Sequence, residues 1–230
     1  MAGLARHRRV ITLDLPGFGA SAPAGEGFEL EAVADRIARG LAGHRVRGPV
    51  DLVGHSLGGA VALSLAVLRP RLVRRLVLVA PAGLGPAPPI PGALLAAGAE
   101  GLYALRRGLA PLTDLAWGRR LLLTLAADDG SRLTAAQARM MVTASEHAQR
   151  TGPALATVAR ADLRPLLHRT RAPLGLIWGA RDLTVRPHLA EEIRAERPDA
   201  RLEEIPGAGH VPMVERPDAF VAALLRLLTS

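Results

Sequence analysis

The chain of 230 residues carries 29 Lys or Arg against 21 Asp or Glu, a formal net charge of +8, and 49% of its residues are hydrophobic. This length suits one domain with a sizeable core, and the absence of Cys excludes disulfides, thiolate nucleophiles and Cys-ligated metals. The strong bases are all Arg and are scattered, while aromatic residues make up only 3%. We therefore expect no binding to nucleic acid, whose recognition uses basic patches and aromatic stacking platforms.

The longest uncharged stretch, residues 76–99, is long enough to span a bilayer. It contains five prolines, a density that a membrane-spanning helix does not tolerate, and we expect a strand followed by a loop. The basic first nine residues lack the apolar stretch of a signal peptide. We expect a soluble, cytoplasmic protein that makes no membrane contact.

Short apolar strands alternate with helices in the first third of the chain. The apolar runs at residues 10–15, 49–54 and 73–80 are typical of buried strands that lead into loops or helices. Between them, residues 30–41 place apolar side chains on one helical face, and residues 57–68 are apolar nearly all round. Strands and helices that alternate at such short intervals predict βαβ crossovers and a parallel sheet.

The alternation stops between residues 82 and 164, where we find no convincing strand. This region opens with Pro and Gly, is interrupted by Asp128-Asp129-Gly130-Ser131, and has its clearest helix at residues 133–149. We expect such an insertion between regular βα units to form a helical cap over a pocket. The expected division of the chain is a first core part (1–81), a helical cap (82–165) and a second core part (166–230).

The alternation resumes in the last third of the chain. Residues 173–179 predict a buried strand, and Pro187 suits the first position of the next helix, where its missing N–H costs nothing. Residues 201–205 predict a last short strand, and a final helix begins at Pro217. The predicted fold class is α/β, a predominantly parallel twisted sheet flanked by helices, with a helical cap insertion.

The pentapeptide Gly54-His55-Ser56-Leu57-Gly58 lies where a predicted strand ends and a predicted helix begins. In a nucleophile elbow the Ser occupies a strained turn, and flanking Gly residues leave room for that turn. The hydroxyl then stands at the helix N-terminus, where backbone N–H groups stabilise developing negative charge. The alternative is a Gly-rich turn in which Ser56 only caps the helix, and the strand-to-helix context favours the elbow.

A serine nucleophile needs a base and an acid that orients the base. Asp182 follows the strand expected at residues 173–179, and His210 lies in the loop after the last strand. Both are expected at the same edge of the sheet as Ser56, where open α/β sheets keep their sites. The remaining histidines, expected at the surface or on helices without a chemical role, are His7, His44, His147, His168 and His188.

Four blocks of sequence resemble the α/β-hydrolase fold family. They are residues 14–21 (DLPGFGAS), 54–59 (GHSLGG), 178–182 (WGARD) and 207–210 (GAGH). The blocks come in the family's order and span nearly the whole chain. More narrowly, they resemble the branch of esterases, C–C bond hydrolases and cofactor-free haloperoxidase-like enzymes.

The resemblance implies a role for each matching residue. Ser56 would be the nucleophile, Asp182 the acid, His210 the base and the N–H of Leu57 one oxyanion donor, while His55 would have no part in proton transfer. The implied activity is hydrolysis of a small ester or related acyl or carbonyl substrate through an acyl-enzyme, with no metal or organic cofactor. A Ser at position 56 also argues against the branches that use an Asp nucleophile there.

Two other functions stay open. A C–C bond hydrolase acting on a β-diketone-type substrate would use the same three residues, and the side chains that decide between the two lie in residues 82–164. A catalytically impaired relative that serves as a binding module would also keep these residues by descent.

The chain departs from the family pattern at its start. Family members begin with three strands before the one expected at residues 10–15, and a loop after the third of these donates the second oxyanion N–H. Without them, the strands at residues 10–15 and 49–54 would pair directly or leave open edges, which invite self-association into a homo-oligomer. We hypothesise that Met1 is not the native start and that this chain is N-terminally truncated; a genuine truncated paralogue is the alternative.

Overall fold

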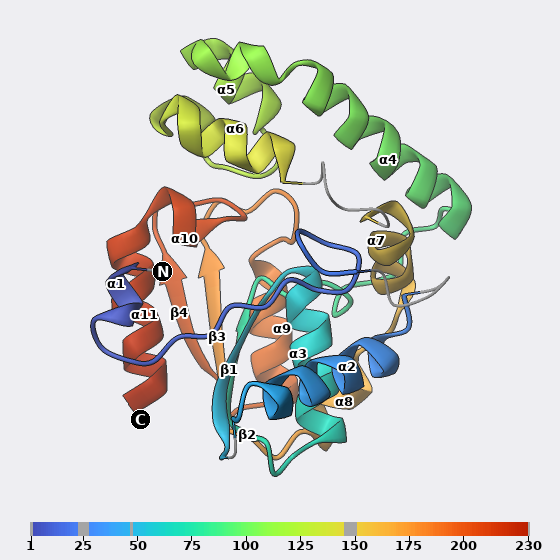
Figure 1. Cartoon of the computed structure of the whole chain (residues 1–230), viewed down its shortest axis with the longest axis vertical. Coiled ribbons are helices and arrows are strands. Elements are labelled where there is room, and N and C mark those ends of the chain that lie inside the picture. Colours follow the sequence, from blue (N-terminus) through green and yellow to red (C-terminus); the bar gives the residue numbers. More distant parts are fainter. Residues whose placement is uncertain (1, 23–27, 47, 145–150, 230) are drawn as a thin grey trace.

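The computed structural model describes residues 2–22, 28–46, 48–144 and 151–229 (Figure 1). Four parallel strands form one sheet in the order of their numbering. They are β1 (Val50–His55), β2 (Val73–Val79), β3 (Leu174–Gly179) and β4 (Arg201–Ile205). Because all four run in the same direction, their carboxyl ends meet at one edge of the sheet, which faces the upper part of Figure 1.

The helices belong either to the core or to the insertion between β2 and β3. The core helices are α1 (Ala2–Ala5), α2 (Leu30–Gly43), α3 (Leu57–Leu68), α8 (Arg164–Arg169), α9 (His188–Glu196), α10 (Pro212–Glu215) and α11 (Pro217–Thr229). The helices of the insertion are α4 (Gly92–Gly108), α5 (Ala116–Leu122), α6 (Ala135–Thr143) and α7 (Thr151–Arg160). In Figure 1, α4, α5 and α6 stand beyond the carboxyl ends of the strands. We call residues 82–163, which precede α8, the insertion.

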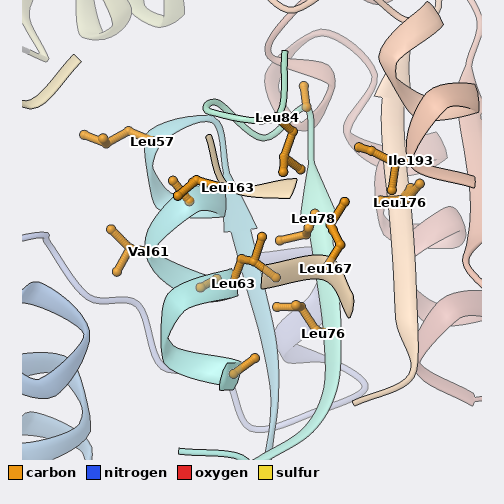
Figure 2. Packing of buried hydrophobic residues seen from close by; sticks show 14 of the residues in the cluster. Leu57, Val61, Leu63, Leu76, Leu78, Leu84, Leu163, Leu167, Leu176 and Ile193 are labelled. Atoms are coloured by element: carbon orange, nitrogen blue, oxygen red, sulfur yellow. The ribbon is translucent and has the colours of Figure 1, made fainter. Parts of the chain in front are cut away.

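Side chains of β2 alternate between the two faces of the sheet and join two separate apolar clusters. Leu76 and Leu78 pack with side chains of α2, α3, α8 and α9. Val77 and Val79 pack on the opposite face with side chains of α1 and α11. Figure 2 shows Leu63 of α3 close to the β2 leucines. Because α3 lies between the sheet and α2, it is buried nearly all round, which explains its uniformly apolar sequence.

The prediction of a strand at residues 10–15 is wrong. This segment has no strand structure, and β1 pairs only with β2 among the described residues. Ile11 and Leu13 are 40% and 41% exposed, and Val53 of β1 is 38% exposed. An apolar run becomes a strand only when a neighbouring strand pairs with its backbone, and this segment has no such partner in the described structure.

Two helix boundaries also differ from those predicted. The helix expected at residues 133–149 is α6, which begins two residues later because Thr134 caps it. Thr134 Oγ1 accepts the N–H of Gln137, and Gln137 Oε1 accepts the N–H of Thr134, which is a capping box. Residues 145–150 of that prediction lie outside the described residues. Pro187 occupies the N-cap position of α9, directly before the first helical residue, His188.

The uncharged stretch at residues 76–99 contains the end of β2, a Pro-rich loop and the first part of α4. The prediction of a strand followed by a loop is confirmed for its first part, and α4 begins directly after Pro91. Among the residues that the structure describes, no helix combines the length and the apolarity needed to cross a membrane.

Candidate active site

The turn between β1 and α3 holds Ser56 in a strained backbone conformation. Ser56 has φ 50° and ψ −118°, between the end of β1 at His55 and the start of α3 at Leu57. Its N–H donates to Val79 O at 3.0 Å, and its carbonyl accepts the N–H of Ala82 at 3.1 Å. A positive φ in a residue with a side chain costs about 1–3 kcal/mol and persists where the surroundings enforce it. The observed turn therefore has the geometry of a nucleophile elbow.

Close packing between β1 and α3 explains the glycine at position 54. A Cβ on Gly54 would overlap the carbonyl oxygen of Gly58 and would lie 2.7 Å from the Cβ of Ala62. Leu57 begins α3, so its N–H belongs to the first turn, where N–H groups have no acceptor within the helix. The positive end of the helix dipole lies at the same place, which suits the oxyanion role expected of the Leu57 N–H.

Asp182 and His210 meet beyond the carboxyl ends of β3 and β4. Asp182 is 2% exposed, and its Oδ1 accepts the N–H groups of Thr184 at 2.7 Å and Val185 at 2.9 Å. Its Oδ2 lies 2.7 Å from Nδ1 of His210. Because a carboxylate only accepts hydrogen bonds, Nδ1 carries a proton, and in the neutral imidazole Nε2 then keeps its lone pair. This is the tautomer that a general base needs.

His55, the residue before Ser56, also contacts His210. Its Nε2 donates to the carbonyl oxygen of His210 at 2.7 Å, and the two ring centroids are 4.7 Å apart. Burial, together with repulsion from His210, lowers the pKa of His55 to about 4, so its ring is neutral near pH 7. The contact ties the elbow to the loop that carries His210. Nothing in the sequence pattern indicated it, because the two residues are 155 positions apart.

The structure thus brings Asp182 into contact with His210, and His210 into contact with the neighbour of Ser56, at one edge of the sheet. The other histidines lie elsewhere. His7 and His44 are exposed, His168 and His188 lie near surface glutamates, and His147 is outside the described residues. In the described part of the chain, no three His, Asp or Glu side chains gather as metal ligands would.

Comparison with known proteins places this chain in a family. Residues 1–223 match the family model described as the alpha/beta hydrolase family, and the chain belongs to that family, in which its relatives are esterases and other hydrolases. The pimeloyl-[acyl-carrier protein] methyl ester esterase of Chromobacterium violaceum is 34% identical over 222 residues, which are 96% of this chain and 84% of that protein. The protein of the same name from Neisseria meningitidis serogroup C is 33% identical over 216 residues, covering 93% of this chain and 80% of the relative. The solved structure of the enol-lactonase from Burkholderia xenovorans LB400 superposes with a TM-score of 0.74 at 26% identity, covering 100% of this chain and 84% of that one.

Proposed function

We propose that this chain is a serine-dependent esterase in which Ser56 is the nucleophile, His210 the general base and Asp182 the acid that orients the base. The observation that carries the proposal is the 2.7 Å contact between Asp182 Oδ2 and His210 Nδ1, at the sheet edge where Ser56 occupies its strained turn. The names of the two esterase relatives support hydrolysis of an ester over cleavage of a C–C bond. The enol-lactonase neighbour also acts, by its name, on an ester bond within a ring.

The proposed reaction has two halves with the same proton carrier. His210 Nε2 takes the proton of the Ser56 hydroxyl as Oγ attacks the ester carbonyl, and the negative charge that forms on the carbonyl oxygen faces the N–H of Leu57. The alcohol leaves with the proton from His210, and an acyl group remains on Ser56. His210 then takes a proton from water as the water oxygen attacks the acyl-enzyme, and it returns this proton to Ser56 Oγ as the acid is released. Asp182 holds the imidazole in its working tautomer throughout.

We further propose that the insertion acts as the cap of this site and that the substrate is a small ester with an apolar acyl group. Leu183, next to Asp182, is 58% exposed. Thr184 Oγ1 donates to the carbonyl oxygen of Leu125 in the insertion at 2.6 Å, and the Leu125 side chain is 48% exposed. Exposed leucines on both sides of a contact between acid loop and insertion support a site that accepts apolar groups.

Hydrolysis of a short-chain p-nitrophenyl ester tests the proposal. We expect activity in the wild type and a loss of at least about a thousandfold in Ser56→Ala, because the nucleophile is removed. Ser64→Ala is the matched control: Ser64 is on α3, 2% exposed, and its hydroxyl has no hydrogen-bond partner in the described structure. A folded wild type without activity, or equal activity in Ser56→Ala, would defeat the proposal.

A further inference from the structure

Glu215 contacts both the loop that carries His210 and the insertion. It is the last residue of α10 and is partly buried. Its Oε1 accepts the N–H of Gly209 at 2.8 Å, and its Oε2 accepts the N–H of Asp128 at 2.7 Å. Both carboxylate oxygens therefore accept hydrogen bonds from backbone N–H groups. One donor directly precedes the proposed base, and the other lies 87 residues before Glu215.

The loop that carries Asp182 contacts the same part of the insertion. Thr184 Oγ1 donates to the carbonyl oxygen of Leu125 at 2.6 Å. Arg181 Nη1 lies 3.2 Å from Oδ1 of Asp128. The residues on either side of the proposed acid are thus attached to the insertion at two points.

Gly209 touches the insertion through its backbone. A Cβ on Gly209 would lie 2.7 Å from the backbone N of Asp128 and 2.8 Å from the carbonyl C of Ala127. The loop of His210 and residues 127–128 are therefore in direct backbone contact. Glu215 spans this contact with one hydrogen bond to each side.

From these contacts we propose that Glu215 is a positioning residue, which couples the insertion to the proposed base His210. The inference rests on the proposed esterase function and gives Glu215 no contact with substrate. With one oxygen on Gly209 and the other on Asp128, the carboxylate sets the path of the His210 loop and seats the insertion against it. A displacement of His210 by about 1 Å would lower the rate about a hundredfold.

A carboxylate suits this position because it has two acceptor oxygens for two N–H donors, and an amide does not. Burial raises the pKa of Glu215, while hydrogen bonds from the N–H groups of Asp128, Gly209 and Val211 oppose that rise. The carboxylate of Asp128 also raises it, and Asp128 is itself paired with Arg181. An amide has one acceptor oxygen, so Glu215→Gln would set an NH2 group against one of the two N–H donors.

The test compares Glu215→Gln with the wild type and with Glu204→Gln, which makes the same change at an exposed side chain of β4. Covalent labelling by a fluorophosphonate measures the reactivity of Ser56, and we expect labelling of Glu215→Gln to be about a hundredfold slower. Amide hydrogen exchange should accelerate in residues 125–128 and 207–211 of this variant alone. The low-field proton resonance of His210 Nδ1–H, which reports the contact with Asp182, should broaden in the same variant.

Unchanged exchange in both segments would overturn the inference, and so would labelling of Glu215→Gln within about threefold of the wild type. If even the wild type resists labelling, the proposed function fails, while the exchange measurement still decides whether Glu215 holds the two segments together. If Glu215→Gln does not fold, Glu215→Asp replaces it, because it keeps both acceptor oxygens on a shorter side chain. Its labelling should then be slower by about tenfold, and the same results would overturn the inference.

Discussion

Replacing His55 with Phe should change how the free energy of unfolding depends on pH. Burial, together with repulsion from His210, lowers the pKa of His55 in the folded chain from 6.5 to about 4. Between these two pH values the unfolded chain binds a proton that the folded chain does not bind, so the wild type loses stability as the pH falls. The loss is about 1.4 kcal/mol per pH unit and about 3 kcal/mol over the whole interval.

The same substitution has a second effect, which does not depend on the titration. His55 Nε2 donates to the carbonyl oxygen of His210, and Phe leaves this acceptor without its partner. At neutral pH the His55→Phe variant should therefore be less stable than the wild type by about 1–3 kcal/mol. Only the wild type has His55 and loses stability as the pH falls from 6.5 towards 4. The difference in free energy of unfolding between wild type and His55→Phe should therefore shrink towards zero, or reverse, as the pH approaches 4.

Urea unfolding of the wild type and of His55→Phe over a series of pH values measures this difference. His44→Phe is the control, because it makes the same change at an exposed histidine and should leave the pH dependence as in the wild type. A difference between wild type and His55→Phe that stays constant from neutral pH down to pH 4 would refute the reasoning. So would an equal change of pH dependence in the control.

Three further substitutions test other parts of the account. Asp182→Asn should lower ester hydrolysis about ten-thousandfold, because an amide no longer fixes the tautomer of the base, and activity within about tenfold of wild type would contradict this. Gly54→Ala places a Cβ against the carbonyl oxygen of Gly58, so the free energy of unfolding should fall by about 1–3 kcal/mol, and an unchanged melting temperature would argue against the close packing. Trp178→Phe removes the hydrogen bond from Nε1 to Val185 O (2.8 Å) in a fully buried site. The free energy of unfolding should fall by about 1–3 kcal/mol in denaturant titrations, and equal unfolding midpoints would disprove this.

The part of the site that follows from local sequence was predictable. Ser56 lies between an apolar strand and an apolar helix, and those two elements alone define the turn that carries it. Asp182 follows a buried apolar strand and His210 follows a short, more polar one. Parallel strands bring their carboxyl ends to one edge of the sheet. For these residues, the order of strands and helices along the chain was enough to place them.

The strand expected at residues 10–15 shows where local sequence fails. Its composition is that of a strand, yet Ile11 and Leu13 are partly exposed and the segment has no strand structure. Strand formation depends on a neighbour that pairs with the backbone, and the composition of a segment does not reveal whether that neighbour is present.

The contacts that hold His210 in place could not be predicted for a related reason. His55 contacts the carbonyl oxygen of His210 across 155 residues, and Glu215, which also binds Gly209, contacts Asp128 across 87 residues. Each contact depends on the three-dimensional path of a loop, and neither involves a spacing that a sequence pattern encodes. In the sequence, His55 and Glu215 have no feature that distinguishes them from other polar residues, and only the structure shows their partners.

The most direct test of the central claim is to identify which residue a fluorophosphonate modifies. Trypsin does not cleave between Arg69 and Pro70, so digestion after Arg47 and Arg71 releases residues 48–71, which contain both Ser56 and Ser64. Fragmentation of this peptide by mass spectrometry distinguishes the two serines. We expect the label to lie on Ser56 and Ser56→Ala to abolish labelling. A label on another residue, or a folded chain in which Ser56 stays unmodified, would contradict it.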